Sequence, residues 1–111
     1  MLFCMTGELS SETTREMIAN PSDCEQTARE VAEALGGRLH SWYATVGGAH
    51  GVMAVFELPP DSSARFGPVP IALSATASGV FQNVQVRRLL TSQEMMESAQ
   101  QAQSALKAYG G

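Results

Sequence analysis

Two neighbouring segments in the middle of the chain, residues 38–46 and 49–57, have the composition of β-strands. Both contain aromatic or β-branched residues, and Gly47-Gly48 between them suits a two-residue turn with positive φ angles. Since side chains alternate along a strand, this hairpin places four facing pairs on one face: Leu39 with Phe56, Ser41 with Ala54, Tyr43 with Val52, and Thr45 with His50. The opposite face carries His40, Trp42, Ala44, Met53 and Val55. Both faces are substantially apolar, so we expect both to be covered.

Further strands and helices are expected on both sides of this hairpin. Met1 to Met5 is short and almost fully apolar, as in a central strand. A short helix ends before Pro21, because the residue before a proline avoids the helical region. A longer helix follows the capping box of Ser22 and Glu25, carries an apolar stripe at helical spacing, and ends at Gly36-Gly37.

The second half of the chain repeats this alternation. A helix of small residues is expected from Pro70 to about Ala77, and a strand from Phe81 to Leu90. Thr91 and Glu94 form a second capping box, which opens a C-terminal helix over about 91–109. Its apolar residues recur with heptad-like spacing at Met95, Ala99, Ala102, Leu106 and Tyr109.

The order of elements predicts one α+β domain over residues 1–111. Strand, helix, strand, strand, helix, strand is the ferredoxin-like βαββαβ plan, with an extra C-terminal helix. The helices can cover one face of its sheet, and the sheet of a second copy is the simplest cover for the other. The 111 residues fit a single core of this kind.

Charge and hydropathy argue against several classes of partner. The net charge is −4 and the chain has no run of Lys or Arg, so no nucleic-acid partner is expected. No stretch has the length to span a membrane, and the first residues lack the basic start of a signal peptide. A cytoplasmic location follows, in which Cys4 and Cys24 are reduced and serve packing. The chain shows no ligand spacing for a metal, and no cofactor is expected.

Several segments together resemble the GYD domain family. They are Asn20-Pro21-Ser22-Asp23, Ala28, Leu35-Gly36-Gly37-Arg38-Leu39, Ser41-Trp42-Tyr43, Gly51-Val52 to Phe56-Glu57, and Leu89-Leu90-Thr91. The resemblance implies a bacterial protein with a ferredoxin-like fold of the dimeric α+β barrel type. It implies no settled function, since related barrels include cofactor-free monooxygenases, isomerases and plain binding proteins.

Two segments depart from the family pattern. The tyrosine and aspartate that give the family its name are replaced by Ala49 and His50. The region from Asp61 to Pro70 is longer and richer in proline than the pattern. A changed turn beside a changed loop indicates either a variant with its own ligand or one that has lost its ligand.

His50 is the candidate catalytic residue, because a histidine can transfer protons near neutral pH. Tyr43 and Thr45 would orient it across the predicted hairpin; the alternative is a partly exposed histidine at the hairpin tip. The candidate ligand-binding residues are Trp42, Val52, Ala54, Phe66 and Arg87. Each has a structural alternative, since aromatic side chains usually pack in cores and a strand arginine usually pairs at the surface.

Three functions remain open at this point. The first is a homodimeric small-molecule-binding domain, which could be a cofactor-independent enzyme acting on an apolar or aromatic compound with a histidine as general acid/base. The second is a non-catalytic interaction or sensor module, or an accessory subunit of a neighbouring enzyme. The third is an assembly protein whose C-terminal helix carries it into larger oligomers. Whether the chain is an enzyme is not decided by its sequence.

Overall fold

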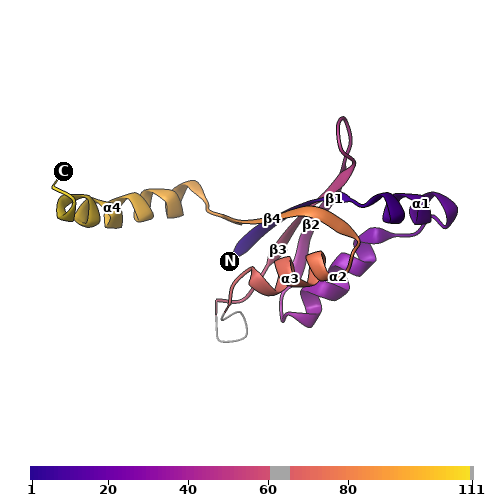
Figure 1. The fold of residues 1–111 in the computed structure, drawn as a ribbon. Coiled ribbons are helices and arrows are strands. Elements are labelled where there is room, and N and C mark those ends of the chain that lie inside the picture. The colour runs from indigo at the N-terminus through magenta and orange to yellow at the C-terminus, as the bar shows by residue number, and fades with distance from the viewer. Residues whose placement is uncertain (61–65, 111) are drawn as a thin grey trace.

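The computed structural model describes residues 1–60 and 66–110. Its elements are β1 (Leu2–Leu9), α1 (Ser11–Ala19), α2 (Cys24–Ala34), β2 (Arg38–Thr45), β3 (Gly51–Glu57), α3 (Val69–Ala77), β4 (Phe81–Leu89) and α4 (Ser92–Ala108). The four strands form one antiparallel sheet in the order β2-β3-β1-β4. This is the ferredoxin-like arrangement, so the predicted α+β class is confirmed, with α1 and α2 both inserted between β1 and β2 (Figure 1).

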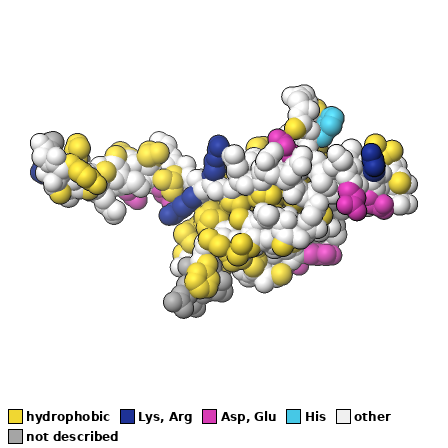
Figure 2. Space-filling model, in the orientation of Figure 1, with side chains coloured by type: hydrophobic (Ala, Val, Ile, Leu, Met, Phe, Trp, Pro, Cys, Tyr) yellow, Lys and Arg dark blue, Asp and Glu magenta, His cyan; other side chains and the backbone are white. Residues whose placement is uncertain are grey.

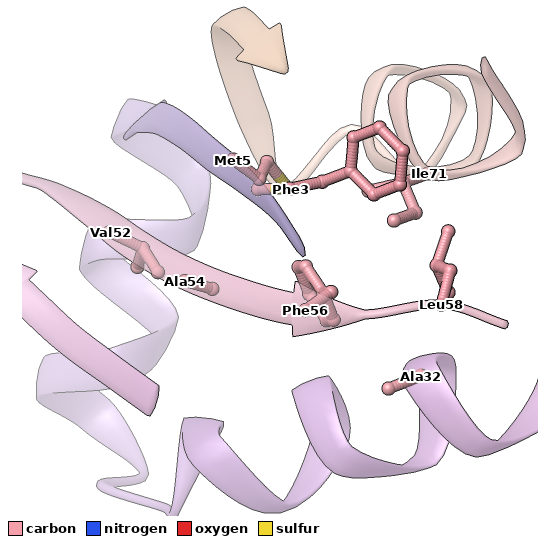
Figure 3. Close-up of a cluster of buried hydrophobic side chains, with 8 residues drawn as sticks. All are labelled: Phe3, Met5, Ala32, Val52, Ala54, Phe56, Leu58 and Ile71. Carbon is pink, nitrogen blue, oxygen red and sulfur yellow. The ribbon is translucent and has the colours of Figure 1, made fainter. Parts of the chain in front are cut away.

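The core lies between one face of the sheet and the helices α2 and α3 (Figure 1). Its buried apolar side chains come from β1, α2, β3, the residue after β3, and α3 (Figure 3): Phe3, Met5, Ala32, Val52, Ala54, Phe56, Leu58 and Ile71. Alanine at position 32 lets α2 lie close to the sheet, because its small side chain keeps the two backbones near each other. Gly37, just before β2, allows a second close approach, since a Cβ there would collide with the Glu57 carbonyl oxygen at the end of β3.

The opposite face of the sheet is not covered by any of the described helices (Figure 1). We call it the open face. Three rows of paired residues cross it, which are Ser41–Val55–Cys4–Arg87, Tyr43–Met53–Thr6–Gln85, and Glu57–Leu2–Leu89. Apolar side chains in the middle of these rows are only half-buried. The second face of the sheet is thus apolar in its middle, as predicted, but no part of the described chain covers it.

The predicted register of the β2–β3 hairpin is wrong. Residues 46–50 form a five-residue loop, so Thr45 pairs with Gly51 and Trp42 pairs with Ala54. A bulge at His40 then restores the predicted pair of Leu39 and Phe56. Gly47 and Gly48 do have positive φ angles, of 94° and 130°, but they lie within the longer loop.

This shift moves Trp42 and Ala44 to the face opposite from the predicted one. Trp42 now shares the helix-covered face with Val52 and Ala54, while Tyr43 lies on the open face. The physical reason is burial, because the shift places the large Trp42 side chain over the core, where it is half-buried. A two-residue turn would have left Trp42 on the side without helices.

Most helix ends follow the sequence signals. The Thr91 hydroxyl accepts a hydrogen bond from the Glu94 N–H, and the Glu94 carboxylate accepts one from the Thr91 N–H, as the capping box predicts. The N-cap of α2 is instead Asp23, whose carboxylate accepts from the Glu25 N–H. Helix α3 begins at Val69, one residue before Pro70. Of the altered segment Asp61 to Pro70, residues 61–65 lie outside the described residues.

Helix α4 leads away from the rest of the molecule (Figure 1). None of its residues is buried, and the chain measures 58 × 31 × 23 Å. The radius of gyration is 17.0 Å, whereas a compact chain of this length has one of about 13 Å. Within the described residues, no helix has the length and hydropathy needed to cross a membrane.

Candidate functional site

A cavity of about 270 Å³ lies between the helix-covered face of the sheet and the helices α1, α2 and α3. Its apolar lining consists of Met5, Leu9, Met17, Ala28, Val31, Trp42, Val52, Ala54, Phe56, Ile71, Ala75, Val80 and Phe81. Its polar lining consists of Thr13, Ser22, Cys24, Thr27, Ser74 and Ser78. The cavity exists because three elements each contribute an alanine, namely Ala28 of α2, Ala54 of β3 and Ala75 of α3, where larger side chains would meet.

The floor of the cavity is set by strand pairing. Trp42, Ala54 and Met5 are consecutive partners across β2, β3 and β1. Since the large Trp42 stands beside the small Ala54, the two side chains create a step in the floor. Val52 lies one pair along, opposite Ala44 of β2. An aromatic wall beside a small residue is a shape that accepts a planar group.

The hydroxyl groups around the cavity differ in what they can still donate. Ser74 and Ser78 donate to the carbonyl oxygens of Ile71 and Ala75, at 3.1 Å and 2.7 Å. Thr13 Oγ1 accepts from Ser10 Oγ at 2.8 Å, which leaves its own proton available. The Thr27 hydroxyl makes no hydrogen bond to any residue in the described part of the chain. The Ser22 hydroxyl likewise makes no hydrogen bond within the described residues, so Thr13, Ser22 and Thr27 are the three hydroxyl groups able to donate to a ligand.

Charged side chains are absent from the described lining of the cavity. No Asp, Glu, His, Lys or Arg of residues 1–60 and 66–110 faces it. Its single ionisable group is the thiol of Cys24, which is free and lies 3.9 Å from the Ser22 carbonyl oxygen. In the same residues, no three His, Cys, Asp or Glu side chains gather where they could hold a metal ion. The described lining therefore offers apolar contact and hydrogen bonds to a ligand.

The structure brings together three of the ligand-binding candidates and disperses the others. Trp42, Val52 and Ala54 line the cavity side by side. Arg87 lies on the open face, where its guanidinium donates to Gln85 Oε1 at 2.8 Å. Phe66 precedes α3 with 67% of its surface exposed and does not line the cavity.

The three catalytic candidates do not face one another as predicted. His50 is exposed in the 46–50 loop, and its carbonyl oxygen accepts from the Leu9 N–H at 2.8 Å. Thr45 pairs with Gly51, and Tyr43 pairs with Met53 on the open face. The predicted cross-strand pair of Thr45 and His50 is wrong, because the loop is longer than the two glycines.

The helical side of the cavity was not found from the sequence. Thr13, Thr27 and Ala75 look like ordinary helix residues, and Cys24 and Ala28 belong to the stripe that predicted packing on the sheet. One signal was present, since a stripe containing alanines leaves little side-chain volume between a helix and a sheet. Such a stripe is compatible both with close packing of the helix on the sheet and with a cavity between them. The distance between the helix and the sheet in the folded chain decides which of the two forms.

The edge of the open face holds the clearest electrostatic feature. Arg38 Nε donates to Glu57 Oε2 at 2.8 Å. The hydrogen bond and the charge of Arg38 lower the pKa of the Glu57 carboxyl. Both side chains are substantially exposed, so this ion pair contributes little to stability and is weakened by salt.

Comparison with known proteins gives one family and one related structure. The sequence model of the GYD domain matches residues 3–99. The chain is also similar to the structure of 5-chloro-2-hydroxyhydroquinone dehydrochlorinase from Burkholderia phenoliruptrix AC1100, in complex with 2,5-dihydroxybenzoquinone. The identity is 18% and the TM-score 0.49, over 84% of this chain and 97% of that one. No curated protein matches the chain.

Proposed function

This chain belongs to the GYD domain family, and we propose that it binds a small, largely apolar molecule in the cavity between its sheet and helices α1, α2 and α3. The observation that carries the proposal is the apolar lining, with three hydroxyl groups free to donate, those of Thr13, Ser22 and Thr27. Pockets for small molecules combine these features, a mainly apolar wall and a few polar groups that fix orientation.

The size of the cavity limits the ligand. An apolar cavity of about 150 Å³ is enough to hold benzene, and this one measures about 270 Å³. A single aromatic ring with one or two small substituents fits that space. A ring substituent with a hydrogen-bond acceptor would find the Thr13 or Thr27 hydroxyl, so phenols and small quinone-like carbonyl compounds match the lining better than plain hydrocarbons.

Binding or sensing is favoured over catalysis by histidine. Proton transfer requires a general acid or base within hydrogen-bond reach of the ligand. His50 is exposed in the hairpin loop and is not among the cavity residues. Catalysis by His50 with Tyr43 and Thr45 would need the loop to rearrange over the open face, which makes the binding module the better-supported proposal.

The open face supports a homodimer of the barrel type. Its middle is apolar, with Leu2, Cys4, Met53 and Val55 half-buried, and its edge carries the Arg38–Glu57 ion pair. An apolar centre with a polar rim is the usual composition of a protein interface. A second copy placed face to face would cover the same surface on both subunits, as a two-fold dimer requires.

The location proposed is the cytoplasm. Cys4 and Cys24 are both free, and they lie on opposite faces of the sheet, Cys4 on the open face and Cys24 at the cavity. Two free thiols are typical of a reducing compartment.

The cavity is tested by filling it. Ala75→Leu adds three carbon atoms inside the cavity, whereas Ala77→Leu makes the same change on an exposed part of α3. With phenol and benzene as probes in ligand-observed NMR, Ala75→Leu should weaken binding by roughly tenfold or more, a loss of about 1.4 kcal/mol. Equal binding by the two variants would place the site elsewhere and refute the proposal.

The hydroxyl is tested by Thr27→Val, which keeps the shape of the side chain and removes its donor. Binding of phenol should weaken by about two- to tenfold, the range for one neutral hydrogen bond, while benzene should be unaffected. If phenol and benzene weaken equally, Thr27 contributes shape and not a hydrogen bond.

A further inference from the structure

Helix α4 has an apolar stripe without a partner in its own chain. The stripe consists of Met95, Ala99, Ala102, Leu106 and Tyr109, and none of these side chains is buried. Figure 2 shows hydrophobic side chains exposed along this helix. Tyr109, at the far end, is 89% exposed. An isolated helix of this length is only marginally stable in water, and its stability in proteins comes from packing its apolar face. The helix therefore calls for a partner that the single chain does not supply.

The charged residues of α4 are kept away from this stripe. The helix contains Glu94, Glu97 and Lys107, and at 100° per residue all three project from the other half of its circumference. The positions that flank the stripe hold Met96, Ser98, Gln103 and Ala105. An uncharged face this wide would be unnecessary on a helix surrounded by water, and it is the composition of a face that packs against another helix.

The first four residues of the stripe have the same order of large and small side chains when read in either direction. Its spacing of 4, 3, 4 and 3 residues is that of a heptad seam. About the midpoint between Gln100 and Gln101, Ala99 is related to Ala102 and Met95 to Leu106. Two copies packed antiparallel would set Met95 against Leu106 and alanine against alanine in the centre, which allows close approach of the helices, and Tyr109 would lie against the small Ser92.

We propose that α4 is an assembly arm, which pairs antiparallel with the α4 of a second copy of this chain. The contact is isologous, as a two-fold axis through the Gln100–Gln101 midpoint requires. It places Ala99 against Ala102 of the partner subunit. It also sets the end that carries Glu94 and Glu97 beside the end that carries Lys107, whereas a parallel pair would set like charges together.

The alternative position for α4 is the outer side of α3. That helix contains no charged residue and exposes Val69 and Leu73. It has nine residues, or about two and a half turns, whereas α4 has 17 residues, or nearly five turns. The exposed part of α3 could cover half of the stripe at most, which is why a second α4 is the better partner.

The arm is separate from the ligand cavity, and its second half lies outside the family match. No residue of α4 lines the cavity, and the GYD match ends at residue 99, inside the helix. The proposal thus stands whether or not the cavity binds a ligand. A helix pair of only two heptads binds two free chains weakly. Its pairing becomes stronger when the two copies are already joined through another surface, such as the open face, because this raises the effective concentration of one helix near the other.

Disulfide trapping in the full chain tests the pairing and its direction. Ala99→Cys and Ala102→Cys are made separately in a Cys4→Ser, Cys24→Ser background, mixed in equal amounts, and oxidised mildly. Antiparallel pairing predicts that the mixed 99–102 disulfide is the main product by peptide mass spectrometry. Gln100→Cys mixed with Gln101→Cys is the matched control, because these positions lie at the same height on the outward side and should not crosslink.

The other outcomes overturn the proposal. Disulfides of 99 with 99 and 102 with 102 would show a parallel pair. A disulfide between Leu73→Cys and Leu106→Cys would place α4 on α3. As a second measurement, Ala99→Glu should lose the larger species in sedimentation velocity, and Gln100→Glu, with the same added charge on the outward side, should keep it. If no 99–102 disulfide forms and the two Glu variants sediment equally, α4 does not pair with a second α4 and the proposal is refuted.

Discussion

Ile71 offers a direct test of the packing that forms the cavity wall. It lies on α3 with 1% of its surface exposed, in the core with Phe3 and Leu58, and it also lines the cavity. Ile71→Ala removes three carbon atoms, and at about 0.8 kcal/mol per buried carbon the transfer cost is about 2.4 kcal/mol. The space left behind joins the existing cavity and adds to this cost, so we expect a loss of about 3 kcal/mol, within the 2–5 kcal/mol range of such changes.

The control is Leu73→Ala on the same helix, where the leucine side chain is 66% exposed. Alanine and leucine have similar helix propensities, so this change should cost under about 0.5 kcal/mol. Urea denaturation at one fixed protein concentration measures both, because oligomers unfold in a concentration-dependent way. With a slope of about 2 kcal/mol/M, Ile71→Ala should lower the midpoint by about 1.5 M. Equal midpoints for the two variants would show that α3 is not packed on the sheet and that the cavity wall is absent.

Three further predictions follow from the site, the open face and the ion pair. His50→Ala should leave the affinity for phenol within about twofold of the parent, because His50 is exposed outside the cavity. A loss of affinity of about tenfold or more in the NMR titration would show that the hairpin loop takes part in ligand binding. Val55→Lys places a charge between Cys4 and Ser41 on the open face, so it should abolish the proposed face-to-face dimer and lower the mass measured by light scattering. Gln85→Lys, near the edge of the face, should leave the mass unchanged, and an unchanged mass for Val55→Lys would contradict the proposed dimer. The pKa of the Glu57 carboxyl is lowered in the folded chain, so its contribution to stability is present above the unfolded pKa and is lost as the pH falls through the folded pKa. Between about pH 5 and pH 3, the parent should therefore lose slightly more stability than Glu57→Gln. Parallel curves of stability against pH for the two proteins would show that the ion pair has no effect.

Local signals in the sequence predicted the elements well, because their causes are local. The capping box of Thr91 and Glu94 needs only four residues to form, and it is present in the structure. The end of α2 likewise depends on Gly36, which adopts a φ of 78°. The N-cap at Asp23 instead of Ser22 shows the limit of such signals, since adjacent residues of similar capping ability compete and the tertiary position of the helix decides.

The candidate site was less predictable because its causes are not local. The side on which Trp42 lies depends on the number of residues in the hairpin loop and on a bulge at His40, and neither has a clear signature in the sequence. The cavity depends on three alanines that are distant in the chain and face one another only after folding. A residue-by-residue interpretation therefore named Trp42, Val52 and Ala54 as candidates but placed Trp42 on the other face, and it missed the helical walls of the cavity.

The bulge at His40 divides the hairpin into two halves that can change independently. In the half far from the loop, the pair of Leu39 and Phe56 fixes the register. In the half next to the loop, which contains Trp42, the length of the 46–50 loop determines the register. A gain or loss of one residue in that loop, absorbed at the bulge, would turn Trp42 out of the cavity and bring a neighbour in without disturbing the core pair. Relatives that differ only in the length of this loop would then differ in the ligands they accept, so loop length offers a route by which ligand preference evolves at little cost to folding.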